Sequence, residues 1–187
     1  MINEKILHDS MPQITNENIV KYLPHLQTLL PKYEINTPLR IAHFLAQVGH
    51  ESLNFYYYRE IASGKAYEGR KDLGNTEVGD GVRFRGRGII QITGRANYKE
   101  CSLSLFGDTR LLDFPELLEL PENGVGAACW FWSKKNLNFY ADKDDLLTIT
   151  KRINGGTNGY RDRHARLIMV VICFQNCIFD IRHTAGC

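Results

Sequence analysis

The chain has 187 residues, of which 43% are hydrophobic and 24% charged, and its formal net charge is +2. This length suits one hydrophobic core and is short for two, so we expect a single domain over residues 1–187. The composition is that of an ordinary globular protein and excludes a disordered chain. A charge of +2 is far from the strongly basic balance of a dedicated nucleic-acid binder, so a nucleic acid is not an expected partner.

The cysteines are odd in number, widely spaced and set mostly in apolar runs: Cys101, Cys129, Cys173, Cys177 and Cys187. This pattern does not indicate a disulfide framework, and we predict reduced, buried thiols. Cys173 and Cys177 would share a helical face, but no matching Cys/His pair stands elsewhere in the chain. The sequence therefore predicts no metal site.

Neither end of the chain has the apolar run of a signal peptide or membrane span. The start, MINEKILHDSMPQ, lacks the uninterrupted apolar region of a secretory signal, and LIMVVICF near the C-terminus is too short to cross a bilayer. We expect a chain that is made in the cytoplasm and not stably inserted in a membrane. Action outside the cell would require a separate pore or a secretion machine.

Two helices are predicted in the first quarter of the chain. Apolar residues recur with a helical period over residues 14–30, with a kink or break expected at Pro24. A second helix should begin where Thr37 suits the N-cap and Pro38 the first helical position, and continue through Val48. Its polar stripe consists of Arg40, His43, Gln47, His50 and Glu51.

Glu51 stands near the end of this mostly apolar helix. Desolvation there disfavours the charged form of a carboxyl, which suits a general acid. A solvated glutamate on a helix edge is an equally weighted alternative. The zinc-protease motif HExxH is excluded, because Asn54 stands where the second histidine would be required.

A second carboxylate, Glu60, ends the aromatic cluster LNFYYYRE at residues 53–60. Glu60 is nine residues after Glu51. If one straight helix contained both, the two would be roughly 13 Å apart along the helix axis and would lie on opposite faces. The carboxyls of inverting glycosidases are roughly 6.5 to 9.5 Å apart. Cooperation of the two therefore requires a bend near Leu53 and Asn54. The tyrosines of the cluster are interpreted mainly as wall and core, although one could serve as a sugar platform.

The next stretch, residues 61–81, is rich in Gly, Ser, Asn, Asp and Glu and is predicted to be a loop. It holds Glu68 and Glu77, which are rivals to Glu60 as a catalytic base, with a solvated surface carboxylate as the alternative for both. Residues 82–92 alternate in a way that predicts a short strand. Their GxG does not extend to GxGxxG, so a dinucleotide site is excluded.

The second half of the chain is predicted to be helical with loops. Helices are expected after Gly94, from Pro121 with two core tryptophans, and over residues 145–152, with a short amphipathic segment at 115–120. The glycine-rich INGGTNGYRDR should break the chain before a last apolar helix at residues 164–178.

Five segments of the chain form a recognisable series: AHFLAQVGHES (42–52), REIASGKAYEGRKDLGNT (59–76), GRGIIQITGRANY (86–98), AACWFW (127–132) and ITKRINGGTNGYRDR (149–163). In this order they resemble the family 19 glycoside hydrolases, which include chitinases and phage endolysins of the lysozyme-like superfamily. The match is close to the endolysin branch. The resemblance implies a mainly α (α+β lysozyme-like) fold, with a helical domain and a small β-element beside a substrate cleft.

The resemblance also implies a reaction, the inverting hydrolysis of β-1,4 links between N-acetylated amino sugars, without a cofactor. A protonated carboxyl donates to the leaving oxygen, and a second carboxylate activates water on the opposite ring face. By this resemblance Glu51 is the acid, Glu60 is the base and Thr93 helps to hold the water. The residues implied to bind the amino-sugar chain are Gln91, Asn97, Tyr98, Asn154 and, near the site, Arg161.

We therefore predict a monomeric endolysin that cuts the glycan of bacterial peptidoglycan. Chitin is the alternative substrate, and a toxin delivered by a secretion machine would equally suit the absent signal. A catalytically silent wall-binding module is an alternative from another class. Against it stands the presence of both Glu51 and Glu60, because a binding module needs no matched acid and base. The segment after Arg163 is more apolar and cysteine-rich than the family implies, which leaves its packing open.

Overall fold

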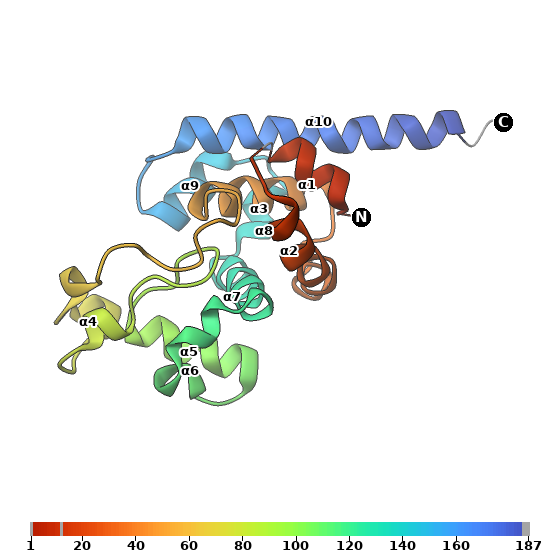
Figure 1. The fold of residues 1–187 in the computed structure, drawn as a ribbon. Helices are drawn as coiled ribbons and strands as arrows, with labels where there is room; N and C mark the ends of the chain where they lie inside the picture. Colours follow the sequence, from red (N-terminus) through yellow and green to blue (C-terminus); the bar gives the residue numbers. More distant parts are fainter. Residues whose placement is uncertain (1, 12, 185–187) are drawn as a thin grey trace.

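The structure is a computed structural model that describes residues 2–11 and 13–184, with side chains up to residue 176. Its described part is mainly helical, as the sequence predicts (Figure 1). The α-helices are α1 (Glu4–Ser10), α2 (Asn16–Leu29), α3 (Pro38–Glu51), α4 (Asp80–Arg83), α5 (Arg95–Phe106), α6 (Arg110–Asp113), α7 (Pro121–Lys134), α8 (Leu137–Ala141), α9 (Leu146–Asn154) and α10 (Tyr160–Thr184). The 3-10 helices are η1 (Pro31–Tyr33), η2 (Lys65–Tyr67), η3 (Lys71–Leu73) and η4 (Pro115–Glu119).

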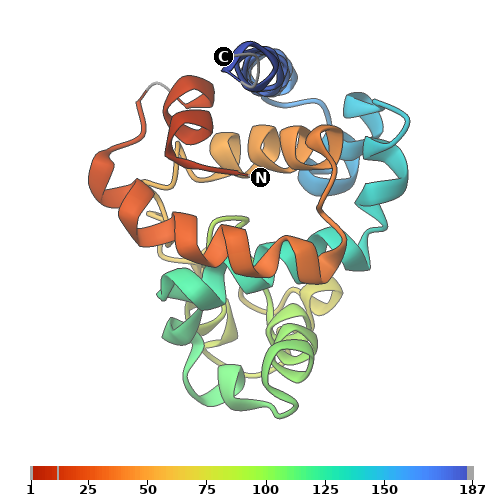
Figure 2. The same cartoon turned by 90° about the vertical axis from the view of Figure 1, so that its right-hand side faces the viewer.

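The long helix α10 lies across one end of the molecule, where it packs along α3 and against α1 (Figures 1 and 2). In the middle α2 packs against α7, and α5 packs against both α6 and α7 at the other end. One cluster of buried apolar side chains connects these helices, from Leu7 and Leu26 through Phe44 to Trp132. The buried helices α3 and α7 are thereby rigid supports for the loops that follow them.

The capping signals at residues 36–38 are confirmed as the start of α3. Thr37 is the N-cap, with its Oγ1 accepting a hydrogen bond from Arg40 N at 3.2 Å, and Pro38 is the first helical residue. The break allowed at Pro24 does not occur, because α2 runs through that residue. Its apolar face is buried on both sides of the proline, at Ile19 and Leu26, so tertiary packing holds the helix together.

The strand predicted over residues 82–92 is wrong. The first two residues belong to α4, and among the described residues the β-structure is limited to the isolated bridges Arg59↔Arg87 and Arg87↔Ile92. Gly88 and Gln91 have φ angles of 75° and 58°, which turn the chain back so that residues 87 and 92 pair within one segment. The small β-element is therefore a tight turn. The alternation in the sequence arises because single residues of this segment are buried in different places, and not because a strand has two faces.

The predicted helices of the second half are confirmed, with changes of boundary that are largest for the last helix. The last helix begins at Tyr160, four residues before the predicted start at 164, and continues to Thr184. Cys101 and Cys129 are free and buried, as expected for reduced thiols, and Cys173 is also buried. Cys177 and Cys187 lie outside the residues whose side chains are described.

Two features are absent from the described part of the chain. No group of three or more His, Cys, Asp or Glu side chains there is placed to hold a metal ion. None of the helices in that part combines the length and the apolar composition that a membrane span needs.

His43 makes the stability of this fold depend on pH. It is fully buried on α3, and its Nε2 lies 2.8 Å from Asp144 Oδ1. Burial lowers the pKa of His43 below its ordinary value of 6.5, and this effect outweighs the opposing one of Asp144. Because the folded chain keeps the histidine neutral, the unfolded chain binds more protons as the pH falls below about 6.5. Stability is therefore full above that pH and is lost below it.

We expect a lower unfolding temperature at pH 5 than at pH 7.5, and a weaker dependence over this range in His43→Gln. Differential scanning calorimetry of both proteins measures the two slopes. Equal slopes would show that another group is responsible.

Candidate active site

A sharp turn follows α3 directly after Glu51. Leu53, Asn54 and Phe55 have φ angles of 49°, 60° and 64°, so three consecutive residues without the freedom of glycine adopt the left-handed conformation. The bend that cooperation of Glu51 and Glu60 requires is thereby confirmed. Each such residue costs roughly 1–2 kcal/mol, and the surroundings must supply that energy.

Contacts to three helices hold this turn. Ser52 Oγ donates to Val48 O at 2.6 Å and accepts from Phe55 N at 2.9 Å. The buried Phe55 ring stacks on Tyr22 of α2, with 5.0 Å between the ring centroids. From α10, Arg166 donates a hydrogen bond to Asn54 Oδ1. The turn is therefore part of the core rather than a loose loop.

Glycine at the exposed position of the turn should test the strain. Leu53→Gly removes a left-handed leucine but adds the unfolded-state entropy of glycine, so we expect a net change within about 0.5 kcal/mol. Leu103→Gly, at an exposed position inside α5, should cost about 1 kcal/mol. Urea unfolding of both variants measures the difference. An equal loss at the two positions would contradict strain at Leu53.

Glu51, the last residue of α3, is held by an arginine from α10. Arg163 Nη2 donates to Glu51 Oε1 at 2.5 Å, and Arg163 Nη1 donates to Gln47 Oε1 at 2.5 Å. The arginine side chain is 0% exposed, while 18% of the Glu51 side chain stays accessible. Glu51 Oε2 accepts no hydrogen bond from a described residue, so this oxygen is available to a ligand.

Sequence reasoning missed Arg163, although it named the nearby Arg161 as a residue close to the site. Arg161 is exposed, one step outside the packed face of α10. The helical spacing of the apolar residues was the signal that was missed. Arg163 is on the same helical face as the buried apolar residues at positions 167, 170 and 174. An arginine in phase with such a row must find a buried partner.

Glu60 is fixed on the other side of the turn. Tyr67 Oη donates to its Oε1 at 2.9 Å, and Gly86 N donates to its Oε2 at 3.0 Å. The backbones are also joined, because Glu60 N donates to Gly86 O at 2.9 Å. Both oxygens of this half-buried carboxylate are thus held in place by protein donors, and each retains a lone pair for a further donor such as water.

Of the other predicted residues, Gln91 lies beside Glu60, and Thr93 and Asn97 follow it in the same segment. A Cβ on Gly86 would lie 2.7 Å from Gln91 Oε1 and 3.3 Å from Glu60 Oε2, so these side chains converge on the glycine. Gln91 O accepts from Thr93 Oγ1 and Thr93 O accepts from Asn97 Nδ2, each at 2.9 Å. The structure therefore brings Gln91 next to Glu60, and Thr93 and Asn97 are linked to Gln91 through backbone carbonyls of the same segment.

The remaining predicted binding residues have different environments. Tyr98 is fully buried, and its hydroxyl donates to Arg85 O at 2.7 Å and accepts from Arg87 Nη1 at 3.0 Å. Burial also raises the pKa of Tyr98. A side chain so enclosed acts on a substrate only through the residues that it positions. Asn154 is exposed at the end of α9, and its predicted contact with the amino-sugar chain stays a prediction.

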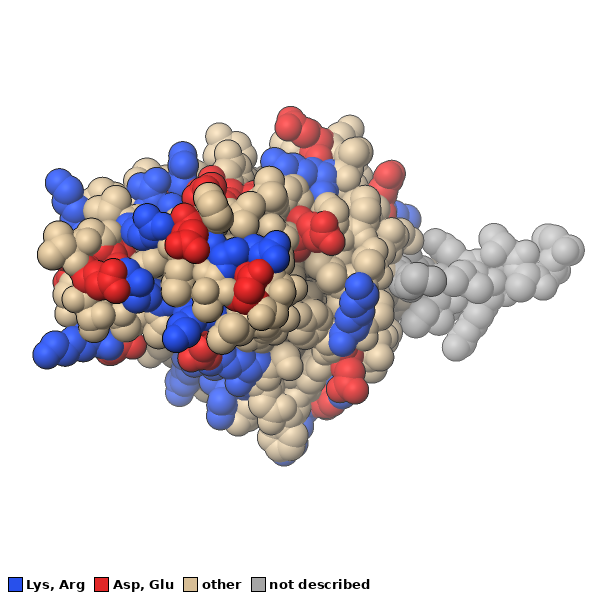
Figure 3. Space-filling view, turned by 90° about the horizontal axis from the view of Figure 1, so that it is seen from below, with Lys and Arg blue, Asp and Glu red and all other residues tan. Residues whose placement is uncertain are grey.

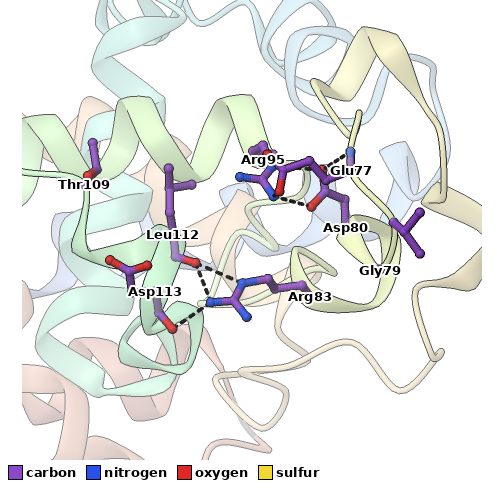
Figure 4. Close-up of a pocket in the computed structure, with 9 residues that line it drawn as sticks. Glu77, Gly79, Asp80, Arg83, Arg95, Thr109, Leu112 and Asp113 are labelled. Atoms are coloured by element: carbon purple, nitrogen blue, oxygen red, sulfur yellow. Dashed lines mark hydrogen bonds and ion pairs between the residues drawn. The ribbon is translucent and has the colours of Figure 1, made fainter.

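The rival carboxylates Glu68 and Glu77 are exposed but engaged elsewhere. Glu68 accepts hydrogen bonds from Gly79 N at 2.6 Å and Gly81 N at 2.8 Å, which ties the loop together. Glu77 pairs with Arg95 at 2.6 Å in a cavity of about 480 Å³ that also contains Asp80 (Figure 4). The pairing of Asp80 with Arg95 lowers the pKa of that aspartate. Both rivals therefore have structural partners.

Charges of both signs are interspersed over the face that α4, α5 and α6 form, the lower end of the molecule in Figure 1 (Figure 3). Neighbouring arginines on this face donate to protein acceptors, as Arg83 does to Leu112 O at 2.9 Å (Figure 4). This face therefore has both positive and negative side chains. A ligand here would be bound by individual pairs of groups and not by the electrostatic field of one sign of charge.

Comparison with other proteins by sequence identifies several relatives, although no family model matches the chain. A glycosyl hydrolase family 19 domain-containing protein of Haemophilus influenzae is 33% identical over 153 residues, covering 65% of this chain and 74% of that protein. Two endochitinases of Arabidopsis thaliana, At2g43620 and At2g43610, are 38% and 37% identical over 123 residues. The chain spans 41% of the length of each of these two plant proteins.

Comparison by structure finds the same fold in solved chitinases. Chitinase C of Streptomyces griseus superimposes with a TM-score of 0.68 at 21% identity, covering 92% of this chain and 76% of that one. A bacterial family 19 chitinase gives a TM-score of 0.72 at 20% identity, with 92% and 94% covered. At these identities the likeness establishes the lysozyme-like, mainly helical fold.

Proposed function

Because the chain belongs to glycoside hydrolase family 19 and is a glycosidase of that type, we propose that it hydrolyses the β-1,4-linked glycan of bacterial peptidoglycan, with inversion. The supporting observation is that two carboxylates are separately anchored on either side of a rigid turn. Glu51 is held by Arg163, and Glu60 by Tyr67 and Gly86. A binding module would not need this pair.

In the proposed reaction Glu51 is the general acid. Its proton passes from the unpartnered oxygen Oε2 to the glycosidic oxygen as the bond to the anomeric carbon breaks. The carboxylate that remains is stabilised by the buried guanidinium of Arg163 at 2.5 Å. Arg163 is thus a positioning residue that fixes Oε1 and leaves Oε2 for the substrate.

Glu60 is the proposed general base. A water between this carboxylate and the anomeric carbon gives a proton to Glu60 while its oxygen forms the new bond on the opposite face of the sugar. Thr93 is proposed to help hold this water. Its hydroxyl donates to Gln91 O, and the side chain of Gln91 lies beside Gly86. Gln91 and Asn97 would contact the sugar, with Tyr98 holding the backbone of residue 85 behind them. Asn154 and Arg161 are proposed as more distant contacts.

The choice of peptidoglycan rests on the resemblance of the motifs to endolysins. Chitin is a second candidate, favoured because the plant relatives and the solved neighbours are named as chitinases. Both polymers consist of N-acetylated amino sugars, so the same acid and base serve either one. If peptidoglycan is the substrate, the enzyme would reach the cell wall through a separate pore or a secretion machine.

Mass spectrometry of the products from purified peptidoglycan and from chitin oligomers tests the proposal. We expect fragments from peptidoglycan, with the sugar at the new reducing end naming the bond that is cut. Proton NMR during the first turnovers should show the α-anomer, as inversion requires. Absence of products from both polymers would refute the function, and products from chitin alone would establish the second candidate.

Paired variants identify the base. Glu60→Gln is expected to lower kcat by about 10²-fold or more, because the amide cannot take the proton of the attacking water. Glu77→Gln has the same chemical change at an exposed carboxylate that pairs with Arg95, and we expect it to keep most of the activity. The reverse order of the two rates would move the role of base to Glu77.

A further inference from the structure

A groove of about 470 Å³ lies where the start of α2 meets the segment after the left-handed turn. The volume is within the range of small-molecule sites, roughly 300–1,000 Å³, and so is sufficient for a sugar unit. We call it the tyrosine groove, and the residues that matter here are Glu17, Asn18, Lys21, Tyr56, Tyr58 and Arg59.

Two tyrosines expose their rings in this groove. Tyr56 is 63% exposed and Tyr58 is 40% exposed, so the interpretation of these rings as core is wrong, although they do form a wall. Tyr56 is supported edge-on by Tyr57, with 4.9 Å between the centroids and 89° between the planes. A fixed aromatic face offers an apolar surface with a polar rim, which suits the C–H face of a sugar whose hydroxyls stay hydrated.

The charges of the groove favour an anion. The Lys21 ammonium lies 5.3 Å from the centroid of the Tyr58 ring and forms no ion pair with a described residue. Arg59 is half exposed, and its one carboxylate neighbour, Glu119, lies 3.7 Å away, at the outer limit of an ion pair. The residues that line the groove therefore include two cations, Lys21 and Arg59, and one carboxylate, Glu17. With Lys21 unpaired and Arg59 only weakly paired, a bound carboxylate would find a positive partner beside the rings.

The groove is next to the candidate active site along the chain. Arg59 lines it, and the next residue is Glu60. Tyr58 O accepts from Gly88 N and Glu60 N donates to Gly86 O, each at 2.9 Å, so both ends of this short segment are tied to the same turn. Two residues span at most about 7 Å of backbone. The backbone that carries the rings is therefore close to the backbone of the proposed base.

We propose that the tyrosine groove binds a carboxylate-bearing amino-sugar unit of the glycan, next to the bond that is cut. This inference rests on the function proposed above. In peptidoglycan such a carboxylate is either the free lactyl group of a muramic acid unit without a peptide or, where a stem peptide is joined to that group as an amide, a carboxylate of the peptide. Chitin has none. The groove would then distinguish the anionic polymer from the neutral one.

Binding to a chain that does not turn over tests this proposal. With Glu51→Gln as the parent, calorimetry would compare three fragments of equal sugar number: peptide-free peptidoglycan glycan, glycan with stem peptides, and chitin oligomer. We expect Lys21→Gln to weaken binding of an anionic fragment relative to chitin oligomer about 5- to 10-fold and to reduce its salt dependence. The anionic fragment with the larger loss identifies which carboxylate is bound.

Two further variants complete the design. Lys32→Gln removes the same charge at an exposed site on η1, outside the groove, and should leave the ratio unchanged. Tyr56→Ala should weaken binding of all three fragments by about 5-fold or more, since the ring contacts the sugar. If the natural chain cuts peptidoglycan while Lys21→Gln and Tyr56→Ala behave as Lys32→Gln does, the groove proposal fails alone. If the natural chain cuts none of the fragments, the proposed function fails with it.

Discussion

Glu51→Gln is expected to lower kcat for glycan hydrolysis by about 10²- to 10⁴-fold, the usual contribution of a general acid. The amide has nearly the shape of the carboxyl but cannot donate an acidic proton to the leaving oxygen. Release of soluble fragments from purified cell walls measures the rate. Activity within a few fold of the natural chain would remove Glu51 from the mechanism.

The fold of this variant should be preserved. The amide oxygen of glutamine can still accept the hydrogen bond that Arg163 Nη2 donates to Glu51 Oε1. Circular dichroism and binding of uncleaved substrate would show that the loss lies in the chemistry. Glu116→Gln, at an exposed site on η4, is the matched control and should retain full activity.

Arg163→Met should have the largest effect on stability. The substitution removes a fully buried cation and leaves both Gln47 and Glu51 without their shared donor. Loss of one partner of a buried pair costs about 3–5 kcal/mol, and we expect about 3 because Glu51 retains some contact with water. For a chain of this size, this corresponds to a decrease in Tm of about 6–12 °C. Scanning calorimetry measures it.

Two comparisons separate this effect from a general loss of packing. Arg161→Met, two positions away on the exposed side of α10, should change Tm little. In Arg163→Met, the second change Glu51→Gln should recover part of the loss, because it removes the carboxylate that was left without its cation. If Arg163→Met and Arg161→Met had equal Tm values, the buried pair would contribute nothing to stability.

Local signals in the sequence were sufficient for most of the helices. Thr37 and Pro38 mark the start of α3, and the period of its apolar residues places Glu51 at its end. These signals involve neighbouring residues, so they act before any tertiary contact forms. The alternation at residues 82–92 was misleading, because the left-handed φ at Gln91 and Gly88 turns the segment back on itself.

The sequence by itself determined the helical class of the fold, its start and stop signals, and the motif that places two carboxylates nine residues apart. Tertiary structure alone decided how each carboxylate is held. Arg163 reaches Glu51 across 112 positions of the chain, and Gly86 reaches Glu60 across 26. Such partners are chosen by the packing of α10 on α3 and by the left-handed turn, whose cost only the folded core can offset.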